Sequence, residues 1–241
     1  MIETLPRLKN HKAFIFIDPY EYKHIKPNDI RDLLANRNTE VLLFLPTQFM
    51  YRFDANGTPE ALKDFIEELV DIKKWKDPDS AREYIEQLKE AFRHYLGAEF
   101  FVDTFTIQKD SKTLFCLFFF CSHIKGFEKM LEAKWEIDTE QGKGWNYTNT
   151  GSLFEQFKTN PLEEKLKDFL KDHKRYNGEL YKFVLTCGFL PKHANEVFFN
   201  WQNNDVIIVE TDKGEKVRKG SFYIACKYYR DEGKKVKLTL R

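Results

Sequence analysis

The sequence has few cysteines, and their spacing excludes several kinds of site. The four residues Cys116, Cys121, Cys187 and Cys226 include no pair with the CxxC spacing of zinc sites and redox motifs. Three of them lie in or beside apolar runs, where a free thiol packs as a small hydrophobic group. We therefore expect reduced cysteines, no bound metal and a reducing, cytoplasmic setting.

Long apolar runs are also absent. The longest, Leu114–Cys121, is far shorter than the roughly 20 residues that a membrane-spanning helix needs. The first residues do not resemble a signal peptide, so we expect no membrane association. Hydrophobic residues make up 42% and charged residues 32% of the 241 positions, which is typical of a globular protein. The 23 phenylalanines favour a core in which flat rings pack on a sheet.

A strong net charge is missing as well, because the whole chain carries only +1. The charge is unevenly distributed, however. Residues 161–241 hold 17 Lys and Arg against 12 Asp and Glu, whereas residues 1–160 hold 22 against 26. The basic back end is explained either by ordinary surface variation or by a surface that faces nucleic acid.

Two apolar runs predict a pair of parallel strands near the start of the chain. Ala13–Ile17 and Thr39–Leu45 are apolar almost throughout and are separated by a helical pattern at Pro27–Asn36. A strand, a helix and a strand in this order form a βαβ unit, whose strands lie parallel. Continuous apolar strands are typical of a sheet that is covered on both faces.

The following residues predict helices and an antiparallel hairpin. Two helices are expected within residues 58–96, the second beginning at Asp79 or Ser80 and ending at Gly97. Glu99–Gln108 and Thr113–Cys121 read as strands joined by a short turn, and a helix follows at Gly126–Trp135. The expected class is α/β, with two parallel strands and a hairpin in one partial sheet.

The polar stretch Asp138–Gly151 marks the expected domain boundary. We predict a first domain at residues 1–137, a linker at 138–160 and a second domain at 161–241. The second shows helical patterns at Leu162–His173, Gly178–Cys187 and Pro191–Asn203, and then a hairpin of Asp205–Glu210 and Ser221–Tyr228. Three helices and a basic hairpin predict a winged-helix-like α+β module.

Several segments together resemble the three-Cys-motif partner proteins, a family with a methyltransferase-like sheet. The resemblance covers most of residues 10–137 and, more loosely, the tail. It depends on Phe16–Tyr20, Tyr22–Ile25, Thr39–Phe44, Arg52–Phe53, Phe118–Phe120 and Gly126–Met130. It implies that the front domain is the second half of a Rossmann-like class I methyltransferase sheet, in which Asp18-Pro19-Tyr20 ends the fourth strand.

Two departures from that family count against activity of this chain alone. The glycine-rich turn that would hold S-adenosylmethionine is not found, because Gly142-Lys143-Gly144 lies in a polar loop with no preceding strand. Glu21 stands where the family usually has glycine. The resemblance therefore implies that S-adenosylmethionine binds only if an amino-terminal half completes the sheet.

Candidate catalytic residues lie at the end of the first strand. In amino-methyltransferases a carboxylate such as Asp18 accepts a hydrogen bond from the target amine, and Tyr20 could stack on a planar target; otherwise both belong to an ordinary turn. His24 is a weaker candidate for a base. Arg52 and His123 could bind an anion, although the pattern favours a surface salt bridge for Arg52 and a simple helix entry for His123.

Candidate nucleic-acid-binding residues lie in the tail. A winged helix would place its third helix in a groove and its hairpin on phosphates. A protein–protein adaptor with a solvated hairpin tip is the alternative. The expected contact residues are Lys192, Asn195, Lys213, Lys216, Arg218 and Lys219.

Two functions from different classes remain open on the sequence. The chain is either a methyltransferase-like subunit or fragment that acts on or binds nucleic acid, or a non-enzymatic adaptor. In the second case the resemblance implies that its partner is a three-cysteine, radical-enzyme-like protein.

Overall fold

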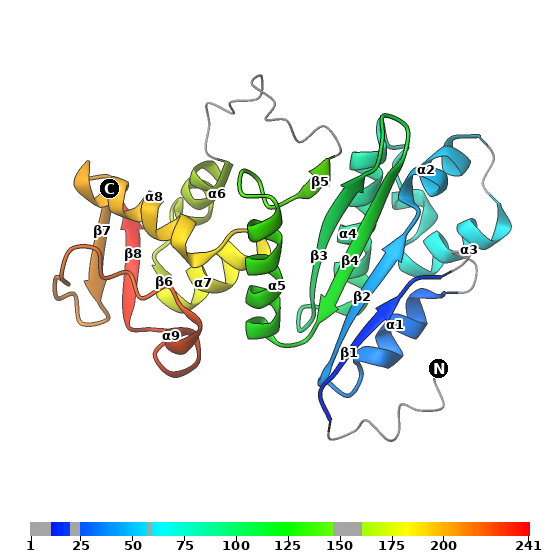
Figure 1. Ribbon diagram of the computed structural model, residues 1–241. Coiled ribbons are helices and arrows are strands. Elements are labelled where there is room, and N and C mark those ends of the chain that lie inside the picture. Colours follow the sequence, from blue (N-terminus) through cyan, green and yellow to red (C-terminus); the bar gives the residue numbers. More distant parts are fainter. Residues whose placement is uncertain (1–10, 20–24, 57–58, 147–160) are drawn as a thin grey trace. The chain divides into compact units, whose positions relative to one another are not determined.

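A computed structural model describes residues 11–19, 25–56, 59–146 and 161–241 (Figure 1). The chain divides into two compact units, Met1–Gly151 and Ser152–Arg241. The division falls inside the polar segment that was expected to link two domains. Each unit is described by itself.

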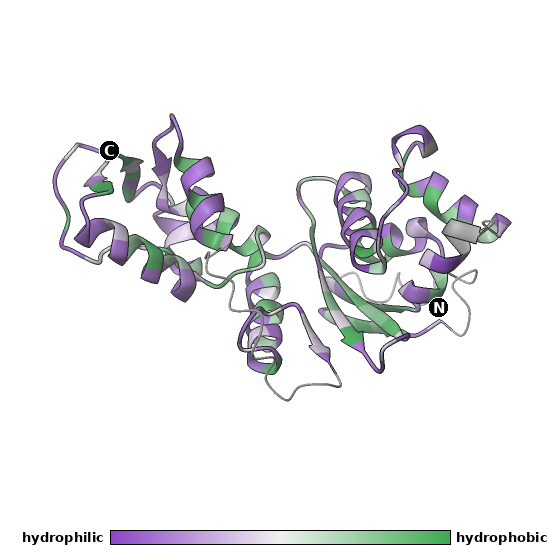
Figure 2. Ribbon diagram, turned by 90° about the horizontal axis from the view of Figure 1, so that it is seen from above, coloured by the Kyte–Doolittle hydropathy of each residue, from purple (hydrophilic) through white to green (hydrophobic). Residues whose placement is uncertain are grey.

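Unit 1 is built on a five-stranded sheet with the order β1-β2-β4-β3-β5. The strands are β1 (Ala13–Ile17), β2 (Thr39–Leu45), β3 (Phe101–Gln108), β4 (Leu114–Cys121) and β5 (Gly144–Asn146). β1 and β2 are parallel, while β3 and β4 form an antiparallel hairpin whose second strand, β4, pairs with β2. The predicted parallel pair and hairpin are confirmed, and the strands are largely hydrophobic (Figure 2).

Four helices and one continuous core cover one face of this sheet. They are α1 (Pro27–Leu34), α2 (Thr47–Asn56), α3 (Glu60–Leu69) and α4 (Ala81–Leu96), and a 3-10 turn lies at Ile72–Lys74. These helices lie beside the sheet (Figure 1), and their buried side chains share one core with the inward residues of β2 and β4. α4 begins as predicted, because the Ser80 hydroxyl accepts a hydrogen bond from the Glu83 N–H at 3.2 Å.

The helix α2 was not predicted. It begins at Thr47, two residues after the end of β2. Met50 on this helix is fully buried in the core, so α2 belongs to the cover of the sheet and not to a loop.

A single helix, α5 (Ile124–Ile137), covers part of the opposite face. It packs on the hairpin side of the sheet, where Phe127 stacks on Phe101 with ring centroids 5.1 Å apart. Lys134 of α5 also forms a buried ion pair with Asp103 of β3. The β1 side of this face is more open, because Phe14 is 57% and Phe16 is 54% exposed.

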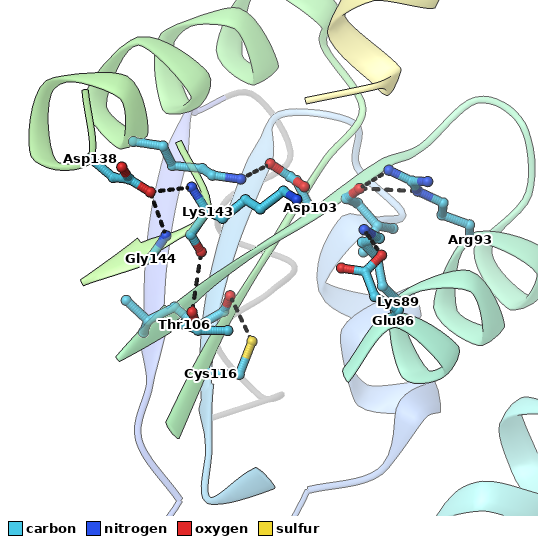
Figure 3. A network of polar contacts seen from close by, with 12 residues as sticks. Glu86, Lys89, Arg93, Asp103, Thr106, Cys116, Asp138, Lys143 and Gly144 are labelled. Atoms are coloured by element: carbon cyan, nitrogen blue, oxygen red, sulfur yellow. Dashed lines mark hydrogen bonds and ion pairs between the residues drawn. The ribbon is translucent and has the colours of Figure 1, made fainter. Parts of the chain in front are cut away.

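The first part of the expected linker belongs to unit 1. The Asp138 carboxylate accepts hydrogen bonds from the N–H groups of four residues, and this folds the loop after α5 back on itself (Figure 3). The loop leads into β5, which pairs in parallel with β3. The expectation of a linker from residue 138 is therefore wrong as far as Asn146, since the sequence pattern does not show where the capped loop rejoins the sheet. Residues 147–160 lie outside the described part.

The described part of unit 2 has four helices and a small sheet with the order β6-β8-β7. The elements are α6 (Pro161–Leu170), β6 (Arg175–Tyr176), α7 (Asn177–Thr186), α8 (Pro191–Asn203), β7 (Ile207–Thr211), α9 (Cys226–Asp231) and β8 (Val236–Leu240). The three predicted helices are confirmed. Both strand pairs are antiparallel, with β8 in the middle.

The predicted second strand of the hairpin, Ser221–Tyr228, is wrong. The strand that pairs with β7 is β8, which begins at Val236, and α9 lies in the long connection between them. Phe222, Ile224 and Cys226 are buried at alternate positions, so their pattern imitates a strand. They fill the core of unit 2 without forming a ladder.

Candidate nucleic-acid interface

The helix α8 has one face in the core and one face in solvent. Ala194, Val197, Phe198 and Trp201 are buried. Phe199 on the opposite face is 46% exposed. The other exposed residues of this helix are Lys192, Glu196, Asn200 and Asn203, while Asn195 is half-buried. The outer face is therefore mixed in character and carries one cation and one anion.

His193 fixes the start of α8. Its Nδ1 accepts a hydrogen bond from the Leu190 N–H at 3.1 Å, which satisfies a backbone donor at the helix terminus. Burial lowers the pKa of His193, and the nearby Lys192 lowers it further. Nδ1 can accept this bond only in the neutral imidazole, so the lowered pKa and the cap favour the same protonation state.

Two of the predicted cations lie on a defined turn after β7. The Thr211 N–H donates to the Glu215 carbonyl at 2.8 Å, and the Gly214 N–H donates back to the Thr211 carbonyl at 2.9 Å. Lys213 and Lys216 are exposed on this turn. It projects from the end of β7 at the place where a winged helix carries its wing.

The other two cations are held beside α8 by a single hydrogen bond. The Gly220 N–H donates to the Gln202 side-chain oxygen at 2.9 Å, and Gly220 adopts φ 81°, a conformation that favours glycine. Arg218 and Lys219 precede this anchor and are exposed. The fold therefore brings the cationic loop to the carboxyl-terminal half of the third helix.

The five cations Lys192, Lys213, Lys216, Arg218 and Lys219 form no ion pair within the described residues. Two of the nearby carboxylates are engaged elsewhere, while the exposed Glu215 lies on the same turn as Lys213 and Lys216. Glu210 pairs with Lys174 and Lys237, and Asp212 accepts a hydrogen bond of 2.5 Å from the Tyr176 hydroxyl. These cations are therefore available to phosphate groups.

Asn177 is a structural residue that the sequence analysis missed. It is fully buried, and its side chain donates to the carbonyls of Tyr223 and Glu232 and accepts from the N–H groups of Lys235 and Val236. Both donor and both acceptor positions of the Asn177 side-chain amide are therefore occupied, and all four bonds are made to the segment that follows β7. The sequence signal was weak, because Asn177-Gly178 also fits an ordinary helix start.

The predicted catalytic residues are not gathered into one site among the described residues. Asp18 lies exposed just after β1, while Tyr20 and His24 lie outside the described part. Arg52 donates to the Lys112 carbonyl at 3.3 Å and so supports the β3–β4 turn. His123 accepts from the Lys125 N–H at the start of α5. Strand register places His123 about 20 Å along the sheet from the level of Asp18.

The glycine-containing loop of unit 1 does not fit a cofactor. Its backbone N–H groups at Lys143 and Gly144 point at the Asp138 carboxylate, at 2.8 and 3.2 Å (Figure 3). This ring of donors lowers the pKa of Asp138, although burial alone would raise it. An anion-binding concavity is thus already filled by the chain's own carboxylate. β1 is moreover an edge strand of the described sheet.

No cluster of His, Cys, Asp and Glu among the described residues has the arrangement of a metal site. The four cysteines are free, and burial raises the pKa values of Cys116 and Cys121 well above those of ordinary thiols. Within the described part, no helix is both long and apolar enough to cross a bilayer.

Comparison with protein families finds one match. Residues 137–214 match a family model described as a GMT-like wHTH domain, about a third of the chain, and the matched part runs from the end of α5 to the turn after β7. Comparisons with curated proteins and with solved structures give no match. The match agrees with the order of elements in unit 2, and the tail is a winged helix.

Proposed function

We propose that this chain is a DNA-binding subunit of a methyltransferase-like assembly, without a cofactor site of its own. Unit 2 binds the backbone of duplex DNA. Unit 1 contributes the second half of a methyltransferase-like sheet. The observation that carries the proposal is the joint surface of α8 and the exposed cations Lys213, Lys216, Arg218 and Lys219 on a winged helix.

The geometry favours contact with phosphates over reading of base edges. The four wing cations are exposed, and Lys192 adds a fifth at the start of α8. The central outer residue of α8 is Phe199, and Glu196 one turn earlier repels phosphate. Phosphate contacts position a protein on the duplex but carry no direct sequence information. The binding should therefore be salt-sensitive and weakly sequence-specific.

The methyltransferase-like part of the proposal is supported by strand order. A parallel pair is followed by a hairpin whose last strand inserts next to β2, as expected for the second half of a class I sheet. In an assembly that completes the sheet, Asp18 and Tyr20 would stand at the rim where ligands bind. We expect no tight S-adenosylmethionine binding by the isolated chain, and micromolar binding in calorimetry would contradict this.

A second candidate function is that of a protein–protein adaptor. The specific observation that favours it is Phe199, a large aromatic side chain exposed at the centre of the outer face of α8. Aromatic side chains of this kind anchor protein interfaces. In this case the partner of α8 would be a protein such as a three-cysteine, radical-enzyme-like one, and the wing cations would be solvated.

The test is binding of the full chain to a labelled DNA duplex at low salt, followed by fluorescence anisotropy. We expect Lys216→Ala, Arg218→Ala and Lys219→Ala together to weaken binding about tenfold or more, because three phosphate contacts are lost. The matched control removes three exposed cations from unit 1, through Arg82→Ala, Lys109→Ala and Lys112→Ala. It should change affinity by less than about twofold.

The two candidate functions give different results in this experiment. Equal weakening by both triple variants would mean that net charge matters and the wing does not. No measurable binding of the intact chain at low salt would refute the DNA-binding proposal. The adaptor function would then be favoured, and Phe199→Ala would be expected to release a protein partner.

A further inference from the structure

The edge strand β1 carries a pattern that is complementary to itself. Its even-numbered residues are Phe14 and Phe16, and the residues that flank the strand are a cation, Lys12, at one end and an anion, Asp18, at the other. All four are exposed. Successive side chains of a strand alternate between the two faces of the sheet, so these four lie along the same, open face.

Within the described sheet, the outer edge of β1 presents backbone groups at these same positions. The Ala13 N–H donates to the Asn38 carbonyl at 3.0 Å, so the backbone groups of Ala13, and by alternation those of Ile15, point towards β2. The N–H and C=O groups of Phe14 and Phe16 therefore point away from β2, to the outer edge. Exposed edges of this kind readily accept another strand.

An antiparallel copy of β1 fits this edge in one register. Hydrogen-bonded pairs must join two residues whose backbone groups point outward, which here are even-numbered. If Phe14 of one copy stands opposite Phe16 of the other, then Lys12 stands opposite Asp18. The aromatic pair and the ion pair are then each formed twice, once on either side of a two-fold axis near Ile15.

We propose that two copies of this chain associate through antiparallel β1 strands, so that their two sheets become one continuous sheet. The proposal concerns unit 1 alone and stands whether or not unit 2 binds DNA. The paired copy occupies the same edge of β1 at which a further half would complete the sheet, so the two arrangements exclude each other at this edge. Pairing covers the aromatic rings of Phe14 and Phe16, which are more than half exposed in the single chain. A short pair of strands buries little area, so the dimer should be weak and concentration-dependent.

A charge-swap series tests the register. Size-exclusion chromatography with light scattering gives the dimer dissociation constant of the full chain. Lys12→Asp and Asp18→Lys should each raise that constant about tenfold, because both cross-strand ion pairs become repulsive. The double variant, Lys12→Asp with Asp18→Lys, restores opposite charges and should return to within about twofold of the unchanged protein.

Disulfide trapping tests the same register independently. Opposed residues in a hydrogen-bonded antiparallel pair have Cα atoms about 5.5 Å apart, within the range that a disulfide spans. Mixing Phe14→Cys with Phe16→Cys protein under mild oxidation should give a covalent mixed dimer. Either variant alone should give much less, because position 14 does not face its own copy.

Clear results would overturn the proposal. A chain that stays monomeric at its highest soluble concentration contradicts it, and the free edge would then accept a strand from a different chain or segment. A dimer that is insensitive to both single charge changes, or whose double variant is as weak as the singles, also contradicts it. Far-UV circular dichroism on every variant verifies that the sheet has formed.

Discussion

The two units differ in the surface that the strands of each sheet leave exposed. In unit 2 the middle strand β8 is paired on both sides, and the connection from β7 is held by the buried side chain of Asn177. In unit 1 the edge strand β1 leaves two phenylalanines exposed on an open face. Unit 2 therefore presents charge to a partner, whereas unit 1 presents backbone and aromatic surface.

This difference indicates two separate kinds of recognition in one chain. Exposed cations beside a helix suit a polyanion, since their attraction is long-ranged and needs little shape complementarity. An open strand edge suits another strand, because main-chain hydrogen bonds require a matching extended segment. The two surfaces should therefore respond to different mutations and to different solution conditions.

The largest expected effect concerns the independence of the two cores. Phe92 is fully buried in unit 1 and its ring centroid lies 4.9 Å from that of Phe120. Phe92→Ala should lower the free energy of unfolding of unit 1 by about 3–5 kcal/mol through the cavity it leaves. Hydrogen exchange should show lost protection in unit 1 only.

Phe198→Ala provides the reciprocal change, because Phe198 is fully buried in unit 2. It should reduce protection in unit 2 and leave unit 1 unchanged. Equal loss of protection across both units after either substitution would show that they unfold as one body, and the comparison would fail.

The next effect concerns the hydrogen bonds of Asn177. Asn177→Ala leaves buried carbonyl and N–H groups of the β7–β8 connection without partners, which should cost about 2–3 kcal/mol of unit 2 stability. Chemical denaturation measures the change. Asn203→Ala, at an exposed position of α8, is the matched control and should cost less than about 0.5 kcal/mol.

A smaller effect is expected from the anchor between Gln202 and Gly220. Gln202→Ala removes the acceptor that holds Arg218 and Lys219 beside α8, a hydrogen bond worth about 1 kcal/mol. DNA affinity measured by anisotropy should fall about twofold to fivefold, while the cations themselves remain. An equivalent truncation in unit 1, Gln108→Ala, should have no effect; unchanged binding by both variants would mean that the anchor does not position the cations.

The smallest effect concerns pH. The pKa of folded His193 lies below its ordinary value near 6.5, so the folded state favours neutral imidazole. Its contribution to unit 2 stability is fully present above about pH 6.5 and is lost as pH falls through the lower folded pKa. His193→Gln keeps an acceptor and should flatten this acid-side decline in thermal unfolding, whereas exposed His173→Gln should not.

Much of the secondary structure was predictable because its signals are local. β1 and β2 are continuous apolar runs, and α4 begins and ends at a serine cap and a glycine. α8 begins at a proline in its first turn, Pro191. These features depend on residues a few positions apart, which a sequence pattern contains directly.

The predictions that failed depend on contacts between residues that lie far apart in the sequence. Phe222, Ile224 and Cys226 alternate in burial as a strand does, yet the partner of β7 is β8, and the distant Asn177 holds the connection between the two strands by hydrogen bonds. The wing cations were predicted from charge alone, whereas the contact that places Arg218 and Lys219 beside α8 joins residues 18 positions apart. The exposure of one face of β1 was not predicted either, because its continuous apolar run was interpreted as a strand covered on both faces.

The most direct test of the central claim is the salt dependence of DNA binding by the full chain. Four or five phosphate contacts predict a slope of roughly −3.6 to −4.5 in a plot of log association constant against log salt concentration. Lys216→Ala, Arg218→Ala and Lys219→Ala together should flatten the slope by about 2.7. A slope near zero, or a steep slope that the triple variant leaves unchanged, would contradict binding through the wing of unit 2.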